Sequence, residues 1–154
     1  DTAFSIQSPL KHGHNAVEAL AAMHAGDSKA LISLGGNDML RGLPPEEARA
    51  NLSAILEGAK SKGLPVFLVG MEAPGNYGAE YKAAFDAIYA DLAAEFGATL
   101  YPFFFQGMTE GNSDPAAMRP FMLEDGIHPN AEGVAKIVAD LGPALQAFLA
   151  AHRP

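Results

Sequence analysis

Cysteine is absent from the 154-residue chain. This absence excludes a disulfide framework, a metal site built from thiolates and a cysteine nucleophile. We expect no metal and no other cofactor.

Basic residues are few, with 10 Lys and Arg against 18 Asp and Glu, which gives a net charge of −8. Proteins that bind the phosphates of nucleic acid need an excess of basic residues instead. Long hydrophobic runs are missing too, because the longest covers about seven residues and a membrane helix needs roughly 20. We expect no nucleic-acid partner and no membrane span. The chain has no basic leader and begins with Asp1 rather than Met, which favours a processed, trimmed or engineered chain.

The composition that remains is typical of a globular protein, with 49% apolar and 18% charged residues. A chain of this length can bury one core. The sequence therefore predicts a single domain over residues 1–154, of which residues 1–29 are atypical.

Short apolar runs alternate with longer segments of helical periodicity. The runs predict strands at residues 30–34, 65–70 and 99–104, with a further short strand at 2–7. The helical segments cover residues 15–24, 44–63, 79–96 and 130–151, the last of them kinked at Gly142-Pro143. This alternation predicts an α/β fold, with a short parallel sheet of three to four strands between two layers of helices.

Three polar segments follow the predicted strands. They are Gly35-Gly36-Asn37-Asp38, the segment 73–78 with Asn76 and Tyr77, and Asp125-Gly-Ile-His128. In a parallel sheet the ligand crevice lies beyond the carboxyl ends of the strands, so all three are candidates for one site.

The residue types in these segments suit acyl transfer. A carboxylate three residues before a histidine can accept the proton on Nδ1, which leaves Nε2 free as a general base. Asp125 and His128 have this spacing. The amide of Asn37 can donate to a developing oxyanion, and Gly35 lets the backbone approach a ligand. Each segment also has a plain structural interpretation: a helix-entry cap, a turn after a strand, and loop packing by Asn76 and Tyr77.

The segments "LISLGGNDMLRGLPPEEARANLSAIL", "APGNYGAEYKAAFDAIYADLAAEFGATLYPFF" and "EDGIHPNAEGV" closely resemble the SGNH, or GDSL-type, hydrolases. The likeness covers about residues 30–150 and points to the arylesterase, thioesterase I and lysophospholipase branch. It implies a flavodoxin-like α/β/α sandwich that hydrolyses esters and thioesters through an acyl-serine. It also implies Asn37 as an oxyanion donor, with Asp125 and His128 as acid and base.

The chain departs from that family at its nucleophile, because no Gly-Asp-Ser-Leu block follows the first strand. Its one Gly-Asp-Ser, which ends at Ser28, precedes the strand at 30–34 and so lies at the wrong end of the sheet. Ser8 directly follows the predicted strand 2–7, where the family's serine would lie, and His12 and His14 are nearby bases. Ser8 is therefore our candidate nucleophile, and the alternative is that the site has none.

The N-terminal segment "SPLKHGHNAVEALAAMHAGDSKALISLGGN" has a weaker likeness to molybdopterin-dependent oxidoreductases of the formate-dehydrogenase type. The chain is too short to hold the domains of such an enzyme. The two likenesses meet near Gly35, which favours a hybrid chain, and a truncated hydrolase is the other interpretation of the atypical N-terminal part.

Two functional hypotheses follow. The first is a serine esterase that acts on short acyl or aryl esters, and the second is a truncated or hybrid scaffold with little or no activity. By the resemblance a periplasmic or secreted location is expected. An uncovered edge at the strand 30–34 would also favour self-association.

Overall fold

A computed structural model describes residues 4–6, 28–109, 111 and 115–153 of the chain. It divides into two compact units, Asp1–Pro102 and Phe103–Arg153, and each is described by itself.

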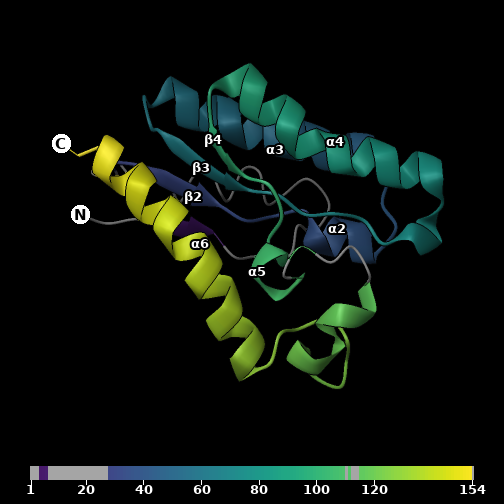
Figure 1. The fold of residues 1–154 in the computed structure, drawn as a ribbon. Coiled ribbons are helices and arrows are strands. Elements are labelled where there is room, and N and C mark those ends of the chain that lie inside the picture. The colour runs from purple at the N-terminus through teal and green to yellow at the C-terminus, as the bar shows by residue number, and fades with distance from the viewer. Residues whose placement is uncertain (1–3, 7–27, 110, 112–114, 154) are drawn as a thin grey trace. The chain divides into compact units, whose positions relative to one another are not determined.

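The first unit holds a four-stranded sheet in which every pairing is parallel (Figure 1). Its strands are β1 (Phe4–Ile6), β2 (Ala30–Ile32), β3 (Val66–Val69) and β4 (Thr99–Tyr101), and they are ordered as in the sequence. The predicted α/β fold with a short parallel sheet is confirmed. The edge of β2 that the sequence left open is paired with β1, and self-association stays a prediction.

The strands β2, β3 and β4 are all shorter than predicted, and the contacts beyond β2 and β4 explain where these two stop. Beyond β2, the Leu34 carbonyl accepts a bond from the Tyr89 hydroxyl at 2.8 Å instead of from a neighbouring strand. Beyond β4, Pro102 has no N–H to give. The Phe103 carbonyl then accepts from Gln106 in a turn.

Helices α3 (Pro45–Ser61) and α4 (Ala79–Phe96) pack against each other along one face of this sheet (Figure 1). Pro45 is the first residue of α3. The carboxylates of Glu46 and Glu47 in the first turn stabilise the helix by interacting with the positive end of its dipole. Gly97 ends α4 with φ of 68°. Both helices were predicted within two residues at either end. Helical cover of the opposite face stays a prediction.

The core of the first unit lies between these helices and the sheet. All four residues of β3 are buried, as a central parallel strand requires. Helical periodicity over residues 44–63 predicts one apolar face, and α3 buries all five of its residues: Ala48, Leu52, Ile55, Leu56 and Ala59. Burial of each large aliphatic side chain contributes about 1.5–3 kcal/mol.

The second unit consists of α5 (Gln106–Thr109), a 3₁₀ segment η2 (Pro115–Phe121) and the long helix α6 (Ala131–Ala151). Gly107 allows α5 and α6 to touch, because a Cβ there would lie 2.5 Å from the Lys136 carbonyl. The helix α6 continues through Pro143. Apolar residues recur along α6 at helical spacing, but only some of them are buried: Ile137 and Phe148 are buried, whereas Val138 is 61% exposed.

By length and composition, α6 is the one helix in the described part of the chain that could cross a membrane. Its most apolar window has a mean hydropathy of 1.4, and 11% of that window is buried. Core helices of soluble proteins reach the same length and hydropathy, so these two properties of α6 do not establish a membrane span. The absence of a membrane span stays a prediction.

Candidate active site

The segment after β2 forms a tight turn into a five-residue helix, α2 (Gly36–Leu40), where the sequence predicted only a turn. Gly35 is the N-cap of α2 and has a φ of 100°, a backbone conformation that residues with a Cβ rarely adopt. A Cβ on Gly35 would also lie 2.2 Å from the hydroxyl oxygen of Tyr89. Both observations require glycine at this position. The predicted role of Gly35 in bringing a ligand to the backbone stays a prediction.

Asn37 lies in the first turn of α2 with an exposed side chain. Its carbonyl accepts a bond from the Arg41 N–H at 3.2 Å. Its amide makes no hydrogen bond with any residue that the structure describes, so both amide hydrogens are available to a ligand.

Asp38 is the next residue and is 1% exposed. Neither of its carboxyl oxygens has a hydrogen-bond partner among the described residues. Burial raises the pKa of Asp38 to about 6, although the charge of Arg41 opposes the rise. The sequence did not single out Asp38, because an Asn-Asp pair after a strand gives no sign of which side chain turns inward.

The segment that follows β3 carries Asn76 and Tyr77 on a short 3₁₀ turn, η1 (Gly75–Tyr77). The Tyr77 hydroxyl donates to the Leu40 carbonyl at 3.3 Å, and its ring stacks on Tyr81 at 5.0 Å between centroids. Asn76 is exposed. The contacts of Tyr77 fit the loop-packing interpretation, and substrate binding by either residue stays a prediction.

In the second unit, Asp125 and His128 are joined as the sequence predicted. Oδ2 of Asp125 lies 2.8 Å from Nδ1 of His128. Oδ1 accepts from the backbone N–H groups of Ile127 at 2.9 Å and His128 at 3.0 Å. These bonds lower the pKa of Asp125 to about 2, the backbone bond from His128 contributing most. The side chain of His128 is 71% exposed, and Nε2 has no partner among the described residues.

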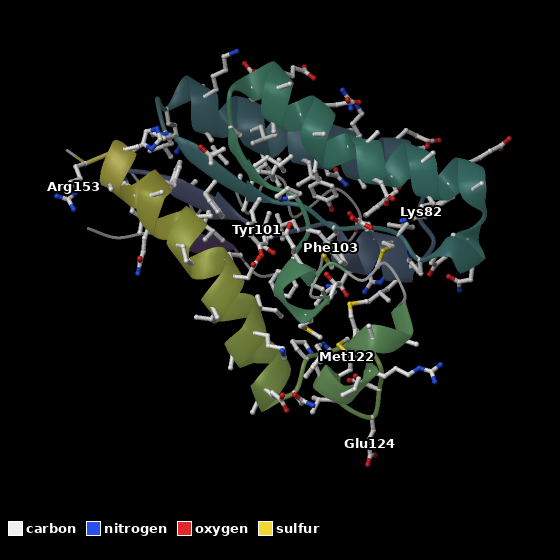
Figure 2. All side chains as sticks on the ribbon, viewed as in Figure 1. Lys82, Tyr101, Phe103, Met122, Glu124 and Arg153 are labelled. Carbon is white, nitrogen blue, oxygen red and sulfur yellow. The ribbon has the colours of Figure 1, made fainter. Side chains whose placement is uncertain are left out.

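The Asp125–His128 turn is closed by backbone bonds on both sides. Leu123 N–H donates to the His128 carbonyl at 2.7 Å, and Asn130 N–H donates to the Phe121 carbonyl at 2.8 Å. Figure 2 shows Met122 within this closed segment, while Glu124 points away from it. Asn130 caps α6 by accepting from Gly133 N–H at 3.0 Å. The turn therefore presents His128 at the mouth of a well-anchored helix.

The predicted site residues divide between the two units, with Gly35, Asn37, Asn76 and Tyr77 in the first and Asp125 and His128 in the second. Ser8, His12 and His14 lie outside the described residues, as does the predicted helix at 15–24. Ser28 lies two residues before β2, at the amino end of the strand, and its hydroxyl accepts a bond from its neighbour Lys29 at 2.9 Å. This is the end opposite to Gly35.

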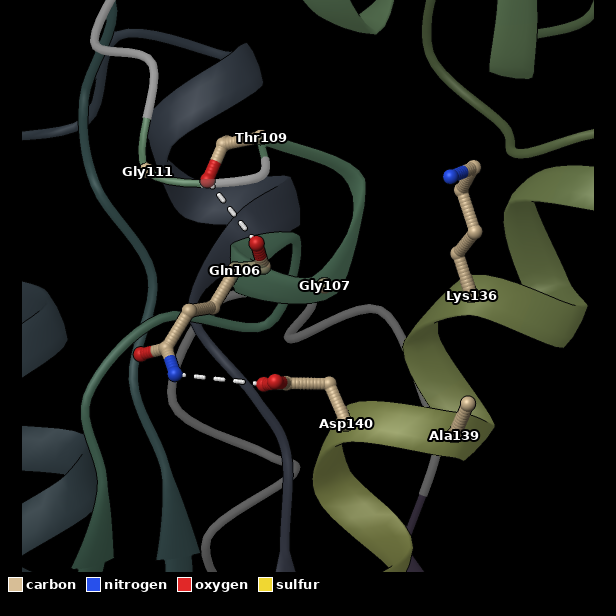
Figure 3. Close-up of a pocket in the computed structure, with 7 residues that line it drawn as sticks. All are labelled: Gln106, Gly107, Thr109, Gly111, Lys136, Ala139 and Asp140. Carbon is tan, nitrogen blue, oxygen red and sulfur yellow. Dashed lines mark hydrogen bonds between the residues drawn. The ribbon is translucent and has the colours of Figure 1, made fainter.

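The second unit has a surface depression of about 640 Å³ between α5 and α6 (Figure 3). Gln106 donates to Asp140 across it at 3.1 Å, and Thr109 donates to the Gln106 carbonyl at 2.8 Å. None of the predicted site residues lines this depression.

Known proteins resemble the chain over most of its length. Residues 6–136 match the model of the GDSL-like Lipase/Acylhydrolase family. The chain is 35% identical over 132 residues to Esterase TesA of Pseudomonas aeruginosa, which covers 84% of the chain and 62% of that protein. It is 40% identical over 116 residues to thioesterase 1/protease 1/lysophospholipase L1 of Escherichia coli, covering 75% of the chain and 52% of that protein.

Among solved structures, a crystal structure of TesA superposes with a TM-score of 0.73 at 32% identity, over 89% of this chain and 73% of that one. Of the two curated relatives, the chain spans about half to three fifths of the length. The hybrid origin and the likeness to molybdopterin enzymes stay hypotheses.

Proposed function

Because the chain belongs to the GDSL-like lipase/acylhydrolase family, we propose that it hydrolyses short acyl or aryl esters. The observation that carries the proposal is the bond from the His128 ring to Asp125, on an exposed turn. A histidine whose Nδ1 is held by a carboxylate keeps Nε2 as the free base that acyl transfer requires.

In this mechanism the free Nε2 of His128 takes the proton of a serine hydroxyl as that hydroxyl attacks the ester carbonyl. Asp125 stabilises the imidazolium that forms, and it remains ionised because its pKa is about 2. The Asn37 amide donates to the oxyanion. His128 then gives the proton to the leaving alcohol, and water hydrolyses the acyl-serine in a second round with the same groups.

We assign the nucleophile to Ser8 on two grounds. The family match begins at residue 6 and so includes Ser8. In addition, β1 ends at Ile6 and is parallel to β2, so the chain leaves both strands at the same edge of the sheet. The polypeptide that leaves β2 at this edge is the one that carries Asn37.

The rival function is a scaffold that folds without a nucleophile. The missing Gly-Asp-Ser-Leu block favours it. Such a chain would keep the Asp125–His128 pair but would form no acyl intermediate.

Covalent labelling distinguishes a serine esterase from a scaffold without a nucleophile. A small activated phosphonate, such as a fluorophosphonate, phosphonylates only a serine that a base activates. Incubation followed by peptide mass spectrometry should place one adduct on Ser8 in the native protein, and none in His128→Ala or in heat-denatured protein. Absence of any serine adduct would support the scaffold.

A further inference from the structure

Four aromatic residues of the first unit form one continuous row of ring contacts, stacked in the first two pairs and edge to face in the last. We call this row the tyrosine ladder: Tyr77, Tyr81, Phe85 and Tyr89. Tyr81, Phe85 and Tyr89 recur every four positions and so share one face of α4, and Tyr77 on η1 precedes them. Neighbouring ring centroids are 5.0, 6.0 and 5.9 Å apart in that order. Aromatic pairs at these separations stabilise one another beyond the effect of burial.

Each hydroxyl of the ladder donates to a carbonyl of residues 34–43, the segment that contains Asn37. Tyr89 donates to Leu34 at 2.8 Å, and Tyr81 donates to Leu43 at 2.9 Å. Tyr77 donates to Leu40 through a longer bond of 3.3 Å. The segment is thus attached to the ladder before α2 and after it.

The contact at Tyr89 is the tightest of these. Tyr89 is 2% exposed, and its hydroxyl occupies the space that a side chain at position 35 would need. Without this hydroxyl the buried Leu34 carbonyl would lose its partner. Burial raises the pKa of both Tyr81 and Tyr89, with a smaller contribution from the charge of Asp38. Both hydroxyls therefore keep their protons and remain donors.

The helix α2 cannot hold itself in place. It has five residues, far below the roughly 12–15 that an isolated helix needs to be stable in water. The side chain of Asn37 has no hydrogen bond to fix it among the described residues, so its direction follows from the backbone of α2.

We propose that Tyr81 and Tyr89 are positioning residues, which orient the Asn37 amide toward the oxyanion by clamping the carbonyls of Leu34 and Leu43. The inference rests on the proposed ester hydrolysis for its kinetic consequence. The orientation of Asn37 can be measured independently of activity.

The test compares Tyr89→Phe and Tyr81→Phe with Tyr101→Phe, which removes a tyrosine hydroxyl from β4 of the same unit, outside the ladder. The first readout is the pair of side-chain amide signals of Asn37 in a ¹⁵N–¹H spectrum, assigned by their loss in Asn37→Ala. Both ladder variants should shift or broaden these signals, and Tyr101→Phe should leave them in place. Unchanged Asn37 signals in both ladder variants would overturn the inference.

The second readout is hydrolysis of nitrophenyl acetate. Loss of a whole oxyanion donor costs about 10²–10³-fold in kcat, so its misalignment should cost on the order of tenfold with KM nearly unchanged. A rise in KM with kcat unchanged would contradict positioning.

The experiment distinguishes failure of the proposed function, and failure of a variant to fold, from failure of the inference itself. If the unsubstituted chain does not hydrolyse the ester, the proposed function fails and the Asn37 signals alone decide the inference. If Tyr89→Phe does not fold, as judged by circular dichroism, Tyr81→Phe decides it, because its hydroxyl lies in a less buried place.

Discussion

Asp125 holds His128 by two of its groups at once, the ring nitrogen Nδ1 at 2.8 Å and the backbone N–H at 3.0 Å. A third bond, from Ile127 N–H, completes the turn. One carboxylate therefore sets both the path of the backbone and the direction of the imidazole. Removal of its charge should affect the ring more than the turn.

Asp125→Asn tests this separation. The amide oxygen can still accept the two backbone bonds, but the NH₂ group presents a donor to Nδ1 and favours the tautomer protonated at Nε2. The base is then lost. Hydrolysis should fall by about 10²–10⁴-fold, and the ¹⁵N shifts of the ring should show the proton moving from Nδ1 to Nε2. Glu124→Gln, which neutralises the neighbouring exposed carboxylate, should change neither. A ring that keeps its Nδ1 proton in Asp125→Asn would contradict the account.

Asp38 should make stability depend on pH. Its pKa is about 6 in the folded chain against 3.8 when exposed, so the folded state binds the proton more tightly. Stability should therefore fall as the pH rises from about 4 to 6 and stay reduced above that. The loss attributable to Asp38 is roughly 1–3 kcal/mol.

Urea unfolding of Asp38→Asn at pH 4 and pH 8 measures how much Asp38 contributes to the pH dependence of stability. The variant should lose less stability than the unsubstituted chain between the two pH values. Asp91→Asn, at an exposed carboxylate, provides the control. Equal pH dependence in Asp38→Asn and the unsubstituted chain would show that the carboxyl is solvated.

Gly35→Ala should be much more harmful than Gly63→Ala. Both glycines have positive φ, of 100° and 68°, so each substitution strains the backbone. A Cβ at Gly63 meets nothing within 4 Å, whereas one at Gly35 meets the Tyr89 hydroxyl. We expect a loss of about 1 kcal/mol at Gly63 and more than about 2 kcal/mol at Gly35, by thermal unfolding. Similar losses would mean that Tyr89 moves away at little cost.

Asn130→Ala should loosen the turn that carries His128. Asn130 caps α6 through Gly133 N–H, and its amide donates to the Pro120 carbonyl at 2.9 Å. Loss of the cap should cost about 0.5–2 kcal/mol. Hydrogen exchange at the Leu123 amide, which bonds to His128, should then quicken more than exchange in α3. Uniform acceleration across the chain would show only a global loss of stability.

The sequence predicted the elements whose signals are local. Alternating apolar runs and helical periods placed β2, β3, β4, α3, α4 and α6, because such a pattern depends only on the spacing of apolar side chains within one element. The Asp125–His128 bond was predictable for the same reason, since three-residue spacing brings the two side chains together within one turn.

What the sequence did not reveal depends on contacts between distant segments. Tyr89 and Leu34 are 55 positions apart, and no sequence pattern at either position predicts the hydrogen bond between them. The sequence places Tyr81, Phe85 and Tyr89 four residues apart within the predicted helix 79–96, but it does not show which acceptors their hydroxyls meet. The inward turn of Asp38 is likewise a tertiary effect.

Kinetics of nitrophenyl acetate hydrolysis by Ser8→Ala, His128→Ala and the double variant test the central claim most directly. If Ser8 and His128 act as one unit, each single change should remove nearly all activity and the double change should cost little more. Activity that survives in Ser8→Ala but not in His128→Ala would mean that His128 activates water and no serine is engaged. Activity that survives both changes would contradict the proposed hydrolytic site.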